Sequence, residues 1–383
     1  MANRMILNET SYFGAGSRSA ISDEVKKRGF KKALVVTDKD LMKFKVTTLV
    51  TDILDGAGLS YEVFDDIKQN PTVENVKEGV QAFKKAEADY IISVGGGSSI
   101  DTAKAIGIII NNPEFSDVVS LEGAVDTKNK SVPHIAVATT AGTAAEVTIN
   151  YVITDVENKR KFVCVDPNDI PIVAIIDPEL MASMPKSLAA ATGMDALTHA
   201  IEGYITKGAW ELTDTLTLKA IEMIARSLRG AVAGDMDAKS TMGLAQYVAG
   251  MAFSNVGLGI VHSMAHPLGA FYDTPHGVAN ALLLPYVMEY NADATGEKYK
   301  YIAKAFGALN ACTMNPDEYR SAAVDAVRKF AIDLEIPQKL SEIGVLESDL
   351  EELAKAAYKD VCTGGNPKET SEKDILEIYK KAF

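Results

Sequence analysis

The first half of the chain alternates short apolar segments with longer amphipathic ones. Five segments are rich in β-branched and other apolar residues, at 33–38, 61–64, 90–94, 134–140 and 173–178. Segments with helical periodicity lie between them, at about 41–57, 73–87 and 100–110. Nearly continuous apolar strands are typical of sheets that are buried on both faces. The alternation therefore predicts a parallel sheet covered by helices.

The second half of the chain follows a different pattern. After about residue 183, helical periodicity dominates, for example over 187–206 and 212–233, and few β-rich segments occur. The pair Met184 and Pro185 stands where the pattern changes. We therefore expect an α/β domain over residues 1–183 and an all-α domain over residues 184–383.

A glycine-rich turn follows the third predicted strand. Gly95, Gly96, Gly97 and Ser98 connect that strand to a helix. Glycines allow a close approach of the backbone to a ligand, and the N-terminus of a helix suits a pyrophosphate. The turn differs from the G-x-G-x-x-G fingerprint, and it is also compatible with a tight turn that binds nothing.

A second polar turn follows the strand at 134–140. Thr139, Thr140 and Thr143 stand at the carboxyl end of that strand, where open α/β sheets bind ligands. The alternative is that these hydroxyls cap the following helix.

Asp38 ends the first predicted strand. A carboxylate there can bind both ribose hydroxyls of an adenosine and would repel a 2′-phosphate, so it favours NAD over NADP. It can also be a plain helix N-cap. Because this acid precedes the glycine turn, the predicted domain is Rossmann-like with a non-standard order of motifs.

The chain has five histidines, which are His134, His199, His262, His266 and His276. Asp195 and His199 are four residues apart, as are His262 and His266, so each pair lies on one helix face. Imidazoles with a carboxylate suit Fe²⁺, Zn²⁺ or a related ion rather than Ca²⁺ or Mg²⁺. The spacing predicts a divalent metal site, but it does not decide which of the last three histidines to leave out.

Composition narrows the possible partners and location. The net charge of −13 disfavours nucleic acid and anionic membranes as partners. The three cysteines are too few and too irregularly spaced for a disulfide framework. The N-terminus has no apolar run typical of a signal peptide, and the longest apolar stretches are too short to cross a bilayer. We therefore expect a cytoplasmic protein.

Together these motifs resemble the iron-dependent (group III) alcohol dehydrogenases. Residues 173–204 and 257–285 match two signatures of that family, and the resemblance covers essentially the whole chain. It implies a dehydroquinate synthase-like architecture, with a Rossmann-like NAD-binding domain, an all-α metal-binding domain and an active site in the cleft between them. It also implies NAD-dependent interconversion of short aldehydes and alcohols, such as lactaldehyde and 1,2-propanediol, and a homodimer. The segment around residues 5–14 would supply an edge strand for pairing with a second copy.

The resemblance also implies roles for individual residues. The metal ligands would be Asp195, His199, His262 and His276, with Fe²⁺ as the ion, while Zn²⁺ or another divalent ion is compatible. His266 would be a catalytic proton relay. The cofactor residues would be Asp38, Asn70, Gly96, Gly97, Ser98, Thr139, Thr140, Thr143, Val152 and Lys161. The substrate contacts would be Asn150, Phe253 and Cys362.

Three other functions share parts of this pattern. A glycerol dehydrogenase-like polyol oxidoreductase would use the same constellation. A dehydroquinate synthase-like lyase would need basic residues to bind a phosphate-bearing substrate, and no cluster of Lys or Arg surrounds the histidines. A non-catalytic NAD-binding module would have no need for the histidines and Asp195 together.

Overall fold

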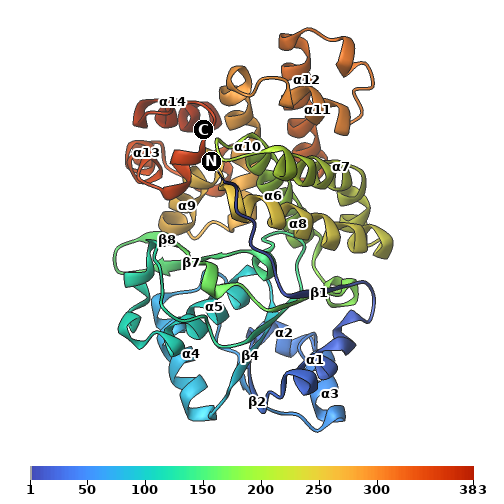
Figure 1. Ribbon diagram of the computed structural model, residues 1–383. Helices are drawn as coiled ribbons and strands as arrows, with labels where there is room; N and C mark the ends of the chain where they lie inside the picture. Colours follow the sequence, from blue (N-terminus) through green and yellow to red (C-terminus); the bar gives the residue numbers. More distant parts are fainter. Residues whose placement is uncertain (1) are drawn as a thin grey trace. The chain divides into compact units, whose positions relative to one another are not determined.

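The computed structural model describes residues 2–383, which divide into two compact units between Ser183 and Met184. We call them the N-terminal unit and the C-terminal unit. The N-terminal unit contains all the strands of residues 2–383, and the C-terminal unit is built from helices. Figure 1 shows the elements of each unit along the chain.

The N-terminal unit contains a parallel sheet of six strands within residues 2–183, in the order β1-β9-β6-β4-β2-β3. This confirms the predicted parallel α/β fold. The edge strand β1, for which the sequence suggests only a pairing edge, adds to the five predicted strands. The bounds are β1 Thr10–Phe13, β2 Lys32–Val36, β3 Ser60–Phe64, β4 Tyr90–Gly95, β6 His134–Ala138 and β9 Val173–Ile176.

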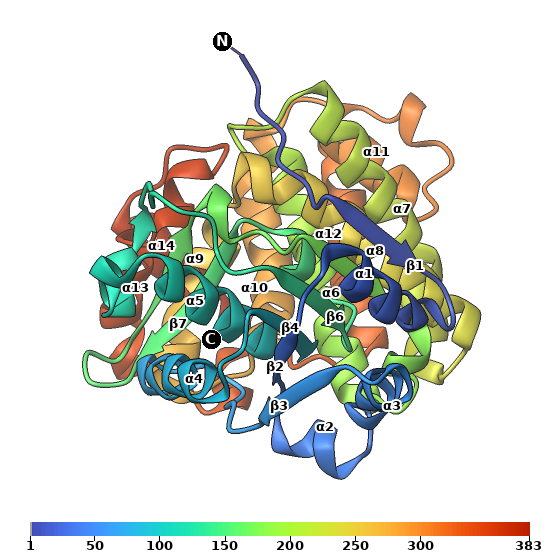
Figure 2. The ribbon, with the colours of Figure 1, turned by 60° about the horizontal axis from the view of Figure 1, so that its bottom comes forward.

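Helices cover both faces of this sheet. Apolar residues of α1 (Ala20–Arg28) and α3 (Thr48–Ala57) pack with Val35 and Ile92 on one face. On the other face, α4 (Val73–Ala86) and α5 (Gly97–Asn111) pack with Leu34 and Ile91. Figure 2 shows α1 and α3 on the side of the sheet opposite α4 and α5. The central strands are buried on both sides, which explains why they are almost continuously apolar.

The structure corrects two details of the N-terminal unit. The helical stretch expected at 41–57 is broken into α2 (Lys39–Lys43) and α3, with Lys45 at a φ of 59° between them. A hairpin of β7 (Asn150–Asp155) and β8 (Arg160–Val165), joined at one edge by the short β5 (Gly123–Ala124), was not predicted. Alternate residues of β7 are buried, so period-two alternation was its sequence signal.

The C-terminal unit is all helical over residues 184–383, as the sequence predicts. Its helices are α6 Lys186–Ile205, α7 Glu211–Ala233, α8 Met236–Val256, α9 Ile260–Tyr272, α10 His276–Asn291, α11 Lys298–Ala305, α12 Pro316–Asp333, α13 Leu350–Tyr358 and α14 Glu372–Ala382. Among residues 2–383, no single helix is long and apolar enough to cross a membrane, although the bent pair α8 and α9 meets the same limits when taken together.

Candidate functional site

Three of the predicted cofactor segments stand at the carboxyl ends of neighbouring parallel strands. Strand β4 pairs with β2 on one side and with β6 on the other. Asp38 therefore follows β2, the glycine turn follows β4, and the threonine turn follows β6, all at the same edge of the sheet. The Thr139 N–H donates to the carbonyl of Gly95 at 3.0 Å and ties two of these turns together. This edge is where open α/β sheets bind dinucleotides.

The glycine turn and the threonine turn leave no room for side chains between them. A Cβ at Gly96 would lie 3.1 Å from Oγ1 and Cγ2 of Thr140, and a Cβ at Gly97 would lie 2.9 Å from Cγ2 of Thr143. Helix α5 begins at Gly97 with no side chain capping its first N–H groups. Backbone N–H groups at a helix N-terminus, flanked by threonine side chains, form a cradle that fits a pyrophosphate.

Other predicted cofactor residues belong to a hydrogen-bonded group beside this turn. Lys161 on β8 donates from Nζ to Oδ1 of Asn70 at 2.7 Å. The Ser98 hydroxyl donates to the carbonyl of Gln69, the residue before Asn70. The Val152 N–H donates to Asp101 on α5 at 3.0 Å. The structure thus links Asn70, Ser98 and Lys161 around the start of α5.

Asp38 has a local structural role in addition to its predicted role. Its Oδ1 accepts from the N–H of Leu41 at 2.8 Å, so Asp38 is the N-cap of α2. Burial raises the pKa of its carboxyl group. The N-cap interpretation of the sequence therefore describes a real contact, and a ribose contact would use the other carboxylate oxygen.

Four side chains of the C-terminal unit converge on one point. Asp195 and His199 come from one face of α6, His262 from the first turn of α9, and His276 from the start of α10. One ligand atom from each lies within 4.8 Å of every other. The Nε2 atoms of His199 and His262 are 3.0 Å apart, and Asp195 Oδ1 is 3.8 Å from Nε2 of His276.

Burial keeps the imidazoles of His199 and His262 neutral. It lowers the pKa of His199 to about 4 and that of His262 to about 3. A neutral imidazole offers a lone pair on one ring nitrogen, as a metal ligand requires. With Asp195 as an anionic member, the cluster is a nitrogen-rich donor set for a first-row divalent ion.

The contacts of Asn280 show that the cluster fits a cation. Its Nδ2 lies 2.7 Å from Oδ1 of Asp195, 3.1 Å from Nε2 of His262 and 3.0 Å from Nε2 of His276. An amide nitrogen carries two protons, so it cannot satisfy three acceptors at once. A bound cation would satisfy these three acceptors together with His199, the fourth member of the cluster.

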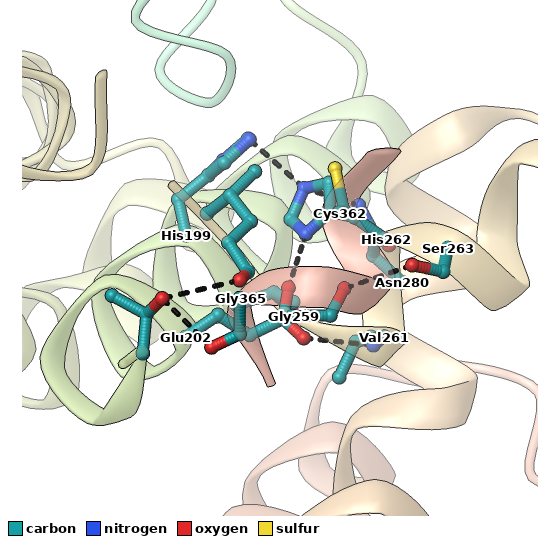
Figure 3. A network of polar contacts seen from close by, with 12 residues as sticks. His199, Glu202, Gly259, Val261, His262, Ser263, Asn280, Cys362 and Gly365 are labelled. Carbon is teal, nitrogen blue, oxygen red and sulfur yellow. Dashed lines mark hydrogen bonds and ion pairs between the residues drawn. The ribbon is translucent and has the colours of Figure 1, made fainter. Parts of the chain in front are cut away.

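Glu202 supports the cluster from the same helix as Asp195 and His199. It is 2% exposed, and its Oε2 lies 2.5 Å from Nδ1 of His262, as Figure 3 shows. Its Oε1 accepts from the N–H of Val261 at 2.7 Å. Burial raises the pKa of Glu202 to about 7, although the backbone N–H groups of Val261, Gly259 and His262 act in the opposite direction.

His266 lies outside the four-residue cluster and has a carboxylate partner of its own. Its Nδ1 is 2.7 Å from Oδ2 of Asp360, and its ring stacks on that of His276 with centroids 5.4 Å apart. Burial acts to raise the pKa of Asp360, but its interactions with His266 and its hydrogen bonds with Cys362 together lower that pKa by more, so the net shift is downward. An Nδ1 held by a carboxylate leaves Nε2 of His266 as the ring nitrogen that can exchange a proton.

The predicted substrate contacts lie in both units. Phe253 stacks on His199 with ring centroids 4.3 Å apart and is 3% exposed. The Cys362 N–H donates to Oδ1 of Asp360 at 2.9 Å, and burial raises the pKa of its thiol well above the usual value. Asn150 begins β7 in the N-terminal unit, where its carbonyl accepts from Nζ of Lys104 at 2.8 Å.

The sequence interpretation missed Glu202, Asn280 and Asp360. Helical spacing carries a signal for two of them. Glu202 follows His199 by three residues, and Asn280 follows His276 by four, so both share a helix face with a predicted ligand. For Asp360 no periodic signal exists, because it comes from the irregular segment after α13.

The fold and the two sites define a class of protein that combines a dinucleotide cradle with a histidine-rich metal site. The family model of iron-containing alcohol dehydrogenases matches residues 8–178, and that of the C-terminal region of the Fe-containing alcohol dehydrogenase family matches residues 189–383. The chain therefore belongs to the iron-containing alcohol dehydrogenase family.

Individual relatives match over the whole chain. The lactaldehyde reductase of Escherichia coli strain K12 is 62% identical over 383 residues, with 100% of both chains covered. The crystal structure of a 1,3-propanediol oxidoreductase has a TM-score of 0.96 and 41% identity, with 100% of both chains covered. The sulfoacetaldehyde reductase of Bifidobacterium kashiwanohense in complex with NAD⁺ has a TM-score of 0.88 and 28% identity, covering 100% of this chain and 99% of that one.

Proposed function

We propose that this protein is an NAD-dependent lactaldehyde reductase that interconverts lactaldehyde and 1,2-propanediol with the help of a divalent metal ion. The observation that carries the proposal is the full-length identity of 62% to a lactaldehyde reductase. The convergent cluster in the C-terminal unit and the cradle in the N-terminal unit supply the two components that such a reaction needs.

In the proposed function, the N-terminal unit binds NAD. The glycine turn and α5 would hold the pyrophosphate through Gly96, Gly97 and Ser98, opposite Thr139, Thr140 and Thr143. Asp38 would bind the adenosine ribose, and Asn70, Val152 and Lys161 would contact the remainder of the cofactor. The absence of side chains at Gly96 and Gly97 supports this assignment, because it lets a phosphate approach the backbone N–H groups at the start of α5.

In the C-terminal unit, Asp195, His199, His262 and His276 would hold the metal, which we propose is Fe²⁺ in the cell, as the family name indicates. When both groups are bound, the metal supplies Lewis acidity at the substrate oxygen and NAD exchanges a hydride with the substrate carbon. Asn150, Phe253 and Cys362 are the residues that we propose for contact with the substrate.

His266 would move the proton that the substrate oxygen gains or loses. Asp360 holds Nδ1 of His266 at 2.7 Å, which fixes the ring and leaves Nε2 for proton exchange. The ring is 4% exposed, so its orientation is set by protein contacts rather than by solvent. A buried imidazole with a fixed tautomer is suited to a relay.

The experiment that tests the proposal is a steady-state panel. The protein is stripped of metal, reloaded with Fe²⁺ or Zn²⁺, and assayed for NADH oxidation with lactaldehyde, glycolaldehyde and 3-hydroxypropanal, and for NAD⁺ reduction with 1,2-propanediol, 1,3-propanediol and glycerol. We expect lactaldehyde and 1,2-propanediol to give the highest kcat/KM in their directions, and a chelator to remove activity. A higher kcat/KM with glycerol, or full activity without metal, would contradict the proposal.

A 1,3-diol is the second candidate substrate, because the 1,3-propanediol oxidoreductase structure has a TM-score of 0.96 to this chain. The same panel separates the two candidates through the ratio of kcat/KM values for the 1,2- and 1,3-diols. We also propose a homodimer and a cytoplasmic location. Strand β1 is at the end of the sheet and pairs only with β9 within residues 2–183, so its outer edge can accept a second copy.

A further inference from the structure

Glu202 makes two contacts with the first turn of α9. Its Oε1 accepts from the Val261 N–H at 2.7 Å, and its Oε2 lies 2.5 Å from Nδ1 of His262. Both carboxylate oxygens therefore contact the segment that contains His262. Because Glu202 belongs to α6, it joins the helix of Asp195 and His199 to the helix of His262.

The side chain of Glu202 is tightly packed at these contacts. The side chain is 2% exposed, and a Cβ on Gly259 would lie 2.8 Å from its Oε1. The φ of Gly259 is −144°, which any residue can adopt, so glycine is needed here for space and not for backbone conformation. The structure thus brings the backbone before α9 directly against the carboxylate.

We infer that Glu202 is a positioning residue that fixes the tautomer of His262 for metal binding. A ring nitrogen that binds a metal must be unprotonated, so the proton of a neutral ligating imidazole must be on the other nitrogen. Oε2 of Glu202 accepts a hydrogen bond from that proton on Nδ1. Nε2 is then the unprotonated nitrogen, and it points at the cluster, 3.0 Å from Nε2 of His199. The inference rests on the proposed function, because it takes His262 to be a metal ligand.

The contrast with glutamine makes the inference testable. The Val261 N–H requires an acceptor, so the amide oxygen of Glu202→Gln would stay at that position and the amide nitrogen would face Nδ1 of His262. A donor at that point favours an unprotonated Nδ1 and places the proton on Nε2, where it blocks the metal. Glutamine fills the same volume, so a residue needed only for packing would tolerate this change.

Asp360 offers a matched control. It holds Nδ1 of His266 at 2.7 Å, four residues along α9, as Glu202 holds that of His262. His266 lies outside the convergent cluster. Asp360→Asn therefore makes the same chemical change at the second histidine of α9, and we expect it to leave the metal affinity unchanged.

The first measurement is the Zn²⁺ dissociation constant of metal-stripped full-length protein, by competition with a chromophoric chelator. We expect Glu202→Gln to weaken binding by about 10- to 100-fold, the usual effect of losing such a partner, and Asp360→Asn to match the wild type. Binding by Glu202→Gln that is less than tenfold weaker would overturn the inference. Equal weakening in both variants would also overturn it, because the effect would not be specific to His262.

The second measurement is made on the wild-type protein and uses a variant only to assign a signal. The chain has only five histidines, so ¹⁵N-histidine labelling gives few ring signals, and the signal lost in His262→Gln identifies His262. In metal-free wild-type protein we expect the His262 proton on Nδ1. A proton on Nε2 would overturn the inference. If the wild type fails to bind Zn²⁺, the proposed metal site fails, while this measurement still decides whether the His262 proton is on Nδ1, where it faces Glu202.

Discussion

Nδ1 of His266 lies 2.7 Å from Oδ2 of Asp360, although the two residues are 94 positions apart in the chain. His262, one turn earlier on α9, has the corresponding contact with Glu202. Both histidines of α9 are thus oriented by carboxylates from other elements. Only His262 belongs to the convergent cluster. The same carboxylate–imidazole contact therefore occurs at one proposed metal ligand and at one histidine outside the cluster.

Removing the His266 imidazole should slow turnover without releasing the metal. We expect His266→Ala to lower kcat by about a hundredfold, within the range for loss of a general acid–base group, and to change the pH profile of kcat. Metal content, measured by mass spectrometry, should remain one ion per chain. Full activity in this variant would remove the proposed relay.

Removing a proposed metal ligand should affect metal binding as well as turnover. We expect His199→Ala to release the ion and abolish turnover, because the remaining three side chains leave one position of the donor set open. NADH binding, followed by fluorescence titration, should stay within about twofold of the wild type, since the predicted cradle lies in the N-terminal unit. His266→Ala is the matched histidine control, and stoichiometric metal in His199→Ala would contradict the assignment.

A methyl group in the glycine turn should obstruct the cofactor. The Cβ of Gly97→Ala would lie 2.9 Å from Cγ2 of Thr143, so the Thr143 side chain or the turn that carries it must shift. We expect the Kd for NADH to rise about tenfold or more, which corresponds to about 1.4 kcal/mol.

The control for this variant is Gly56→Ala in α3, where a Cβ would meet no atom within 4 Å. That change should leave NADH binding unchanged and stabilise the helix by up to about 1 kcal/mol. Equal NADH affinities in the two variants would argue against a phosphate cradle at Gly97.

The stability of the N-terminal unit should depend on pH through His134. This ring is 1% exposed, its Nε2 lies 2.7 Å from the Ser93 hydroxyl, and its Nδ1 has no partner among the described residues. Burial, together with the charge of Lys104, lowers its pKa from 6.5 to about 3. The unfolded chain therefore binds a proton that the folded chain excludes between these two pH values.

It follows that His134 makes the N-terminal unit less stable as the pH falls below about 6.5. Between pH 6 and pH 5, we expect the wild type to lose about 1 kcal/mol more than His134→Gln does. Hydrogen exchange of the β4 and β6 amides, corrected for intrinsic rates, measures the difference. Parallel pH dependences in the two proteins would show that His134 does not cause the loss.

Parts of the fold and site were predictable because they depend on local pattern. Buried strands such as β4 are apolar throughout, and the glycine turn follows β4 directly in sequence. The pair Asp195 and His199 was found because helical spacing alone puts both on one face. The hairpin of β7 and β8 was overlooked, because its alternating pattern is short and half polar.

The sequence by itself determined the two kinds of domain, the scarcity of histidines and the helix faces that carry them. Only the tertiary structure decided which atoms meet. Spacing could not separate His262, His266 and His276, because α10 must pack against both α6 and α9 before their side chains converge. Tertiary packing also brings Glu202 to His262, and the packing of α13 and the segment after it on α9 brings Asp360 to His266. Such contacts join residues 60 and 94 positions apart, and no local pattern encodes a distance of that kind.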